Sequence, residues 1–157
     1  MTAPYNTPAD LTDYAALRGI TITGDPAQLL QLAHDSVDSH RFKGSKTDPL
    51  QPNEWPRTGV FMHGVEIPDT EIPDYSGGYS VIRMELETAL AVDAGNDPSA
   101  PVERAIKSST KKVSTLEKTI EYMDNASPVV RSPKINQAGG QLLAGGGGFR
   151  VSNGAAE

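Results

Sequence analysis

Three histidines, His34, His40 and His63, are the first side chains to consider as metal ligands. They are too few and too widely spaced for a histidine-rich metal site, so we expect them at the solvated surface. The segment 93–97 holds acidic side chains around a glycine, but it lacks the regular ligand positions and the closing Glu of a calcium loop. It is better explained as the end of a helix. The sequence therefore predicts neither a metal site nor a cofactor.

Paired carboxyl groups are the next candidates, because general acid–base chemistry needs two such groups at a fixed separation in different environments. Glu85 and Glu87 point to different sides of the helix expected there, and Asp69 and Glu71 lie in a proline-rich loop. Ser108–Lys111 places a hydroxyl and an amine three positions apart, but the companion motifs of Ser/Lys acyl enzymes are missing. The chain has no cysteine, which excludes a thiolate nucleophile and a cysteine zinc site. We expect no enzymatic activity.

Length and composition point to one domain followed by a tail. The chain has 157 residues, of which 37% are hydrophobic, and 15 Gly and 12 Pro, so we expect a small core and many loops. The domain is expected over residues 1–144, and four glycines open a flexible tail over 145–157. No apolar run approaches the roughly 20 residues of a membrane span, and the first residues do not form a secretory signal. A net charge of −6 argues against a dedicated duplex-DNA binder.

Helical signals dominate the remaining pattern. Thr7 and Asp25 each precede a proline and are suited to cap a helix start. Caps and apolar spacing together predict helices over residues 8–18, 26–41, 76–93 and 135–144. We therefore predict a mainly α fold, a small helical bundle with extended β-like arms and a long proline-rich loop.

The loop and the arms are the two segments without a clear helical pattern. Prolines interrupt every possible helix or central strand over Gly44–Pro73, which predicts a long loop, ordered or disordered. The spacing of residues 113–123 fits a helix or a strand equally. Because its Ser and Thr residues lower helix propensity, we expect extended arms over about 102–123, joined near Ser109–Lys112.

The only tryptophan of the chain, Trp55, precedes Pro56 and Arg57 in this loop. A ring of this size needs a pocket to bury it, and Arg57 can donate to a carboxylate or a carbonyl. Two interpretations stay open. Trp55 fills the domain's own small core, or it makes a contact between subunits.

The loop and its surroundings resemble the head-tail connector proteins of long-tailed bacteriophages, a family also labelled DnaT-like single-stranded-DNA-binding proteins. The similarity covers roughly residues 8–144 and departs from the pattern in an acidic insertion near residues 67–73 and in the Gly-rich tail. The matching motifs are, in order, Arg41-Phe42, Gly44, Lys46–Pro49, Gln51-Pro52, Trp55–Val60, Ile72-Pro73, Ile106–Ser109, Lys112-Val113, Ile120–Tyr122 and Ile135–Leu143.

The resemblance implies a structural virion protein. Such a protein forms a ring of 12 copies beneath the capsid portal, extends the DNA channel and docks the tail. Its partners are further copies of itself, the portal, a stopper or other tail-side connector, and passing genomic DNA that is not bound in a sequence-specific way; no membrane is involved. The implied location is the virion neck, with assembly in the host cytoplasm. The net acidity suits such a conduit, and it equally suits simple solubility.

Ring formation requires two different complementary faces on each subunit, and the arms could add strands to a neighbour. The tail could order on binding to the portal. The candidate interface residues are Trp55, Pro56 and Arg57 in the loop, Lys107, Val113, Ile120 and Tyr122 in the arms, Leu142 and Leu143 in the closing helix, and Phe149, Arg150 and Val151 in the tail.

The alternative function is that of a replication protein that binds single-stranded DNA. Such proteins combine stacking aromatic side chains with a basic groove. The chain has nine aromatic residues, and only around Trp55 do they alternate with cations. Binding to an oligonucleotide that weakens with salt distinguishes this alternative from the connector.

Overall fold

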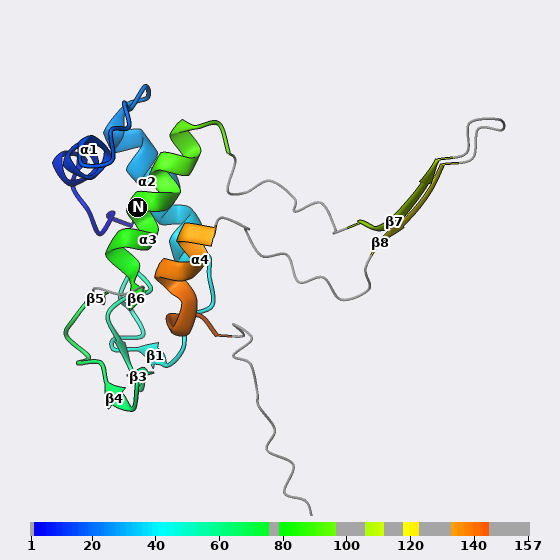
Figure 1. Ribbon diagram of the computed structural model, residues 1–157. Coiled ribbons are helices and arrows are strands. Elements are labelled where there is room, and N and C mark those ends of the chain that lie inside the picture. The colour runs from blue at the N-terminus through cyan, green and yellow to red at the C-terminus, as the bar shows by residue number, and fades with distance from the viewer. Residues whose placement is uncertain (1, 76–78, 97–105, 112–117, 123–132, 145–157) are drawn as a thin grey trace, which may run out of the picture. The chain divides into compact units, whose positions relative to one another are not determined.

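The computed structural model describes residues 2–75, 79–96, 106–111, 118–122 and 133–144, the segments 106–111 and 118–122 through their backbone only. The chain divides into two compact units. One comprises residues 1–98 and 132–157, and the other comprises residues 99–131. Among the described residues, the first unit contains four α-helices and six short strands, and the second contains a two-stranded hairpin (Figure 1).

The first two helices begin where their caps predict. Helix α1 spans Pro8–Ala16, and Thr7 and Asp10 form a capping box in which each side chain bonds to the other residue's backbone N–H. Helix α2 spans Pro26–Asp38 and is capped by Asp25. It ends before Arg41, the expected end, because the chain turns there to bring Phe42 into the core.

Helix α3 spans Val81–Asp93 and contacts each of the other three helices (Figure 1). The expected start at Ser76 is wrong, because the residues just before the helix pair as strands. Ser80 caps α3 instead, since its Oγ accepts a hydrogen bond of 2.9 Å from the backbone N–H of Arg83. Helix α4 spans Pro133–Gly139 and continues as a single 3-10 turn over Gly140–Leu142.

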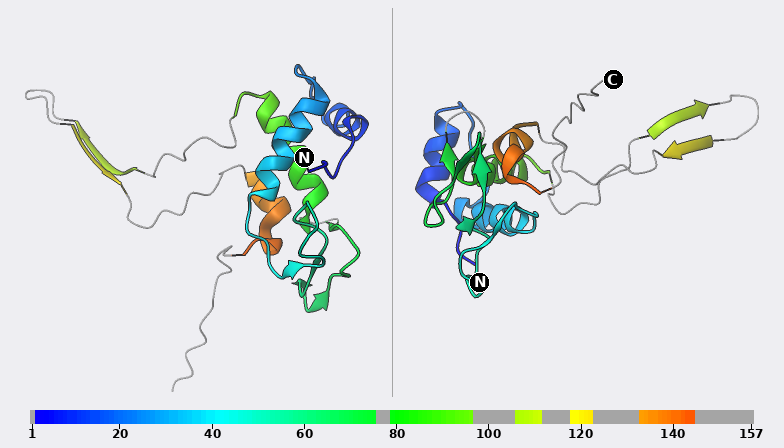
Figure 2. Two further views of the ribbon diagram at one scale, coloured as in Figure 1. Left: turned by 180° about the vertical axis from the view of Figure 1, so that it is seen from behind. Right: turned by 90° about the horizontal axis from the view of Figure 1, so that it is seen from below.

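The expectation of a mainly α fold is wrong, because the first unit also holds three two-stranded antiparallel sheets. They gather at the end of the helices where α3 begins (Figure 2). Prolines forbid long strands in this part of the chain, but ladders of two residues fit between them. The strands are β1 (Ser45–Lys46) with β2 (Arg57–Thr58), β3 (Phe61–Met62) with β4 (Val65–Glu66), and β5 (Asp74–Tyr75) with β6 (Tyr79–Ser80).

The proline-rich segment is thus an ordered part of the domain. Gly44 has a φ of 70°, and a Cβ at this position would collide with the backbone oxygen of Thr58 across the β1–β2 ladder. A glycine is therefore required for this close approach. The segment also supplies Trp55, Val60 and Ile67 to the core.

In the part of the first unit that the structure describes, the core consists of two clusters of buried side chains. One joins α1, α2 and α3 through residues such as Leu11, Leu30 and Leu86. The other joins α2, α3 and α4 to the proline-rich segment. Trp55 lies in this second cluster, 2% exposed, with its ring edge-to-face against Phe42 at a centroid distance of 5.6 Å.

The second unit contains strands β7 (Ile106–Lys111) and β8 (Lys118–Tyr122), paired antiparallel with a bulge between Ile106 and Ser108. The segment expected to form extended arms is thus a hairpin. The join expected near Ser109–Lys112 is wrong, since Ser109, Thr110 and Lys111 all pair within the ladder.

Candidate functional site

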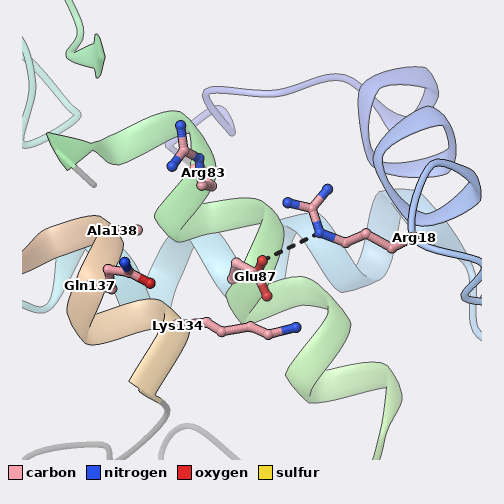
Figure 3. A pocket seen from close by; sticks show the side chains of 6 residues that line it. All are labelled: Arg18, Arg83, Glu87, Lys134, Gln137 and Ala138. Carbon is pink, nitrogen blue, oxygen red and sulfur yellow. Dashed lines mark ion pairs between the residues drawn. The ribbon is translucent and has the colours of Figure 1, made fainter. Parts of the chain in front are cut away.

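A pocket of about 220 Å³ opens between the chain after α1, the first half of α3 and the start of α4. Three cations from these three segments line it (Figure 3). Its lining residues are Arg18, Arg83, Glu87, Lys134, Gln137 and Ala138. We call it the basic pocket.

The guanidinium of Arg18 is held in place from two sides. Its Nε lies 3.6 Å from Oε1 of Glu87, and its Cζ lies 3.4 Å from the centroid of the Tyr14 ring. The Tyr14 hydroxyl donates a hydrogen bond of 2.7 Å to the same Glu87 oxygen. Burial and this hydrogen bond raise the pKa of Tyr14, so the phenol remains a donor at neutral pH.

Arg83 and Lys134 make no ion pair among the residues that the structure describes. Glu87 is the only acidic residue in the lining, so the three cations leave a net charge of +2 on the pocket. This is a concentration of positive charge on a chain whose net charge is −6. An arrangement of this kind favours binding of an anionic group such as a phosphate.

A second polar cluster lies inside the first unit, around the Glu85 carboxylate. Glu85 and His34 are both 0% exposed, and the expectation that His34 is solvated is wrong. One Glu85 oxygen accepts hydrogen bonds from the backbone N–H of Tyr5 (3.0 Å) and from His34, and the other accepts from the backbone and the side chain of Asn6 (2.9 and 2.7 Å). We call this set the Glu85 cluster.

Asp38 extends the Glu85 cluster toward the proline-rich segment. Its Oδ2 lies 3.4 Å from Nε2 of His34 and accepts from the backbone N–H of Glu54 at 3.1 Å. Its Oδ1 accepts from the Tyr5 hydroxyl at 2.6 Å, and the Tyr5 oxygen in turn accepts from the backbone N–H of Trp55. Burial and the bond to Asp38 raise the pKa of Tyr5. The cluster ties the N-terminal segment to α2, α3 and the loop, which is a structural role.

The structure decides between the two interpretations of Trp55 in favour of the domain's own core. Arg57 is 8% exposed, and its guanidinium is hydrogen-bonded within the domain. Its Nε donates to the backbone oxygen of Lys43 and its Nη2 to that of Gly44, both at 2.8 Å, while its Nη1 pairs with Glu54 at 2.6 Å. Pro56 is half-buried between them.

The other predicted interface residues are distributed over different parts of the chain. Leu142 is buried in the core, and Leu143 forms an isolated β-bridge with Phe42. The hairpin ladder places Lys107 at the bulge and Ile120 and Tyr122 in β8. Outside the described residues lie Val113, Phe149, Arg150 and Val151.

Sequence reasoning missed the cations of the basic pocket, because they come from three segments far apart in the chain. A partial signal exists in the spacing of Arg83 and Glu87, which are one helical turn apart on α3. The burial of His34 has a clearer sequence signal, since His34 lies four residues after Leu30 and three before Val37 in the buried stripe of α2.

Two features of the described residues bear on other classes of site. None of their helices has the length and apolar character needed to cross a bilayer. Over the same ranges, His, Asp and Glu side chains form no group of three placed to hold a metal ion.

Comparison with known proteins identifies the family. Residues 3–154 match the family described as "Putative DnaT-like ssDNA binding protein", so nearly the whole chain is covered. The chain belongs to this family. The description names binding of single-stranded DNA and does not mention a connector ring. Neither a curated protein nor a solved structure matches the chain.

Proposed function

We propose that this protein binds single-stranded nucleic acid, without catalysis, and that the basic pocket holds a backbone phosphate. The observation that carries the proposal is that Arg18, Arg83 and Lys134 line one pocket of an acidic protein. Membership of a family described as single-stranded-DNA-binding supports the same function.

The pocket is suited to a flexible strand. A single strand can turn a phosphate into a recess, whereas the phosphates of a duplex follow a fixed helical path. Arg18 is already positioned by Tyr14 and Glu87, so little side-chain entropy is lost when it binds an anion. The Gln137 amide adds a neutral donor to the lining.

The test is fluorescence anisotropy of a labelled oligothymidylate with the full chain and with the double variant R83A/K134A. If two phosphate contacts are lost, the affinity falls about 25-fold at about 0.1 M salt, since each contact contributes about fivefold there. The matched control is R41A/K43A, which removes the same charge from two exposed residues outside the pocket. Equal affinities for both double variants would contradict the proposal.

A second candidate function is the connector ring between portal and tail, favoured by the hairpin of the second unit. In the described residues, β7 and β8 pair only with each other, so each strand keeps one open edge. An open edge can pair with a strand of a neighbouring copy. In this proposal the ring lies in the virion neck, and the tail residues Phe149, Arg150 and Val151 dock to the portal.

Light scattering tests the ring directly. A mass corresponding to a ring, reduced by deletion of residues 108–112 while the helical circular dichroism is retained, supports the connector. A monomer that ignores portal rings and binds the oligonucleotide contradicts it. Truncation after Ala144 tests the tail separately, because portal docking by the truncated chain would exclude a role for residues 145–157.

A further inference from the structure

The hairpin of the second unit carries an excess of positive charge. Residues 99–131 contain six Lys or Arg and four Asp or Glu, a net charge of +2. The whole chain carries −6, so the remaining residues together carry −8. The positive charge of the hairpin is therefore a local property and not a reflection of the overall composition.

Two of these lysines are register partners. Lys111 ends β7, Lys118 begins β8, and the two lie directly opposite each other in the antiparallel ladder. Like charges at directly opposite positions destabilise a ladder, and a two-stranded sheet is marginally stable by itself. A bound anion between the two positions would convert this repulsion into attraction.

The same face of the ladder continues with an aromatic residue. Successive residues of a strand alternate between faces, so Lys118, Ile120 and Tyr122 share one face of β8. Ser109 and Lys111 of β7 lie on this face as register partners of Ile120 and Lys118. Lys118 and Tyr122 are about 13 Å apart along the strand. The opposite face carries the pairs Thr110–Thr119 and Ser108–Glu121, with no cation.

We infer that this face of the hairpin is a second contact surface for single-stranded nucleic acid, with a phosphate at Lys111 and Lys118 and a base stacked at Tyr122. The inference rests on the proposed function and adds a site outside the basic pocket. Positive charge beside an aromatic residue is the combination with which proteins hold single strands without sequence preference. The class of ligand is a single strand of DNA or RNA.

The test is oligothymidylate anisotropy with the full chain, comparing K111A/K118A with T110A/T119A on the opposite face. Removing the lysines also removes a like-charge repulsion, so the ladder itself is not weakened. We expect K111A/K118A to lose about 25-fold in affinity at about 0.1 M salt, and the salt slope to become shallower by about 1.4. For T110A/T119A we expect a change of less than about twofold, because no phosphate contact is lost.

A matched pair of substitutions tests the stacking contact. Tyr122→Phe keeps an aromatic ring and is expected to keep the affinity, whereas Tyr122→Leu is expected to lose about fivefold or more. Equal affinities of the two variants would overturn the role of Tyr122.

The outcomes separate the inference from the proposed function. If the wild-type chain binds, R83A/K134A weakens binding and K111A/K118A does not, the hairpin surface is wrong and the basic pocket stands. If the wild-type chain does not bind at low salt, both are wrong. If K111A/K118A lowers the mass in solution but not the affinity for the oligonucleotide, the lysines dock on the acidic surface of another copy, and the inference is overturned.

Discussion

The Nδ1 atom of His34 lies 2.9 Å from Oε1 of Glu85, and both side chains are completely buried. A carboxylate only accepts hydrogen bonds, so Nδ1 of His34 carries the proton and donates it. Through this pair α2 is bonded to α3, and Glu85 also holds the backbone N–H groups of Tyr5 and Asn6. The Glu85 carboxylate thus links the N-terminal segment to both α2 and α3.

Substitution Glu85→Gln is expected to destabilise the fold by about 3 kcal/mol, because an amide group would face donors that the carboxylate now satisfies. Urea unfolding followed by circular dichroism measures the change. The control is Glu66→Gln, a substitution of an exposed residue, for which we expect less than about 0.5 kcal/mol. Equal stabilities of the two variants would show that the Glu85 cluster does not support the fold.

Substitution Trp55→Ala is expected to cost about 3–5 kcal/mol, the usual range for emptying a buried tryptophan site. Trp55 is the only tryptophan, so its fluorescence reports on the second core cluster alone. In the wild-type chain we expect emission typical of a buried ring that changes only when the domain unfolds. Emission typical of a solvated ring in the native protein would contradict the placement of Trp55 in the core.

The carboxylate of Asp93 links the end of α3 to the turn before α2 and predicts an acid-sensitive contact. Hydrogen bonds from the backbone N–H groups of Gly24 and Thr23 hold the pKa of Asp93 below its ordinary value of 3.8. Because the folded-state pKa is lowered, this contribution to stability is complete above the ordinary value and is lost as the pH falls through the folded-state pKa. We therefore expect the melting temperature of the Asp93→Asn variant to fall less than that of the wild type when the pH is lowered from neutral to about 3.

The control for this measurement is Asp69→Asn, since Asp69 is exposed and its carboxylate makes no hydrogen bond among the described residues. The melting temperature of Asp69→Asn is expected to fall with pH as that of the wild type does. If the melting temperature of Asp93→Asn also falls as that of the wild type does, the contact does not contribute to acid sensitivity.

Substitution Glu87→Gln is expected to strengthen binding of single strands. The change removes the only negative charge of the basic pocket and raises its net charge from +2 to +3, while the amide oxygen can still accept from the Tyr14 hydroxyl. One additional cation available to phosphate corresponds to about fivefold in affinity at about 0.1 M salt. Anisotropy with the oligonucleotide measures this gain, and a loss of affinity would contradict the expectation and show that the ion pair that positions Arg18 matters more than the added charge.

The parts of the fold that the sequence predicts correctly are those with a local cause. Thr7 and Asp25 cap helices through bonds to residues two or three positions away, and both helix starts are confirmed. The end of α2 depends instead on Phe42, which pairs with Leu143 near the other end of the chain. Periodicity within α2 contains no information about such a distant contact.

The mainly α expectation failed for a related reason. The short ladders of the proline-rich segment join residues such as Lys46 and Arg57, whose pairing depends on the fold of the intervening chain. The basic pocket depends even more on distant contacts, because Arg18, Arg83 and Lys134 line one pocket only when the segments that carry them pack together. Lys111 and Lys118, in contrast, are close in sequence, but which lysines face each other depends on the hairpin register.

The most direct test of the central claim is the salt dependence of oligonucleotide affinity for the wild-type chain and for R83A/K134A. We expect the wild type to bind at low salt, and a plot of log K against log salt to become shallower by about 1.4 in the variant, corresponding to two lost phosphate contacts. A folded wild-type chain that does not bind at low salt, or a variant with an unchanged slope, would contradict the role of the basic pocket in phosphate binding.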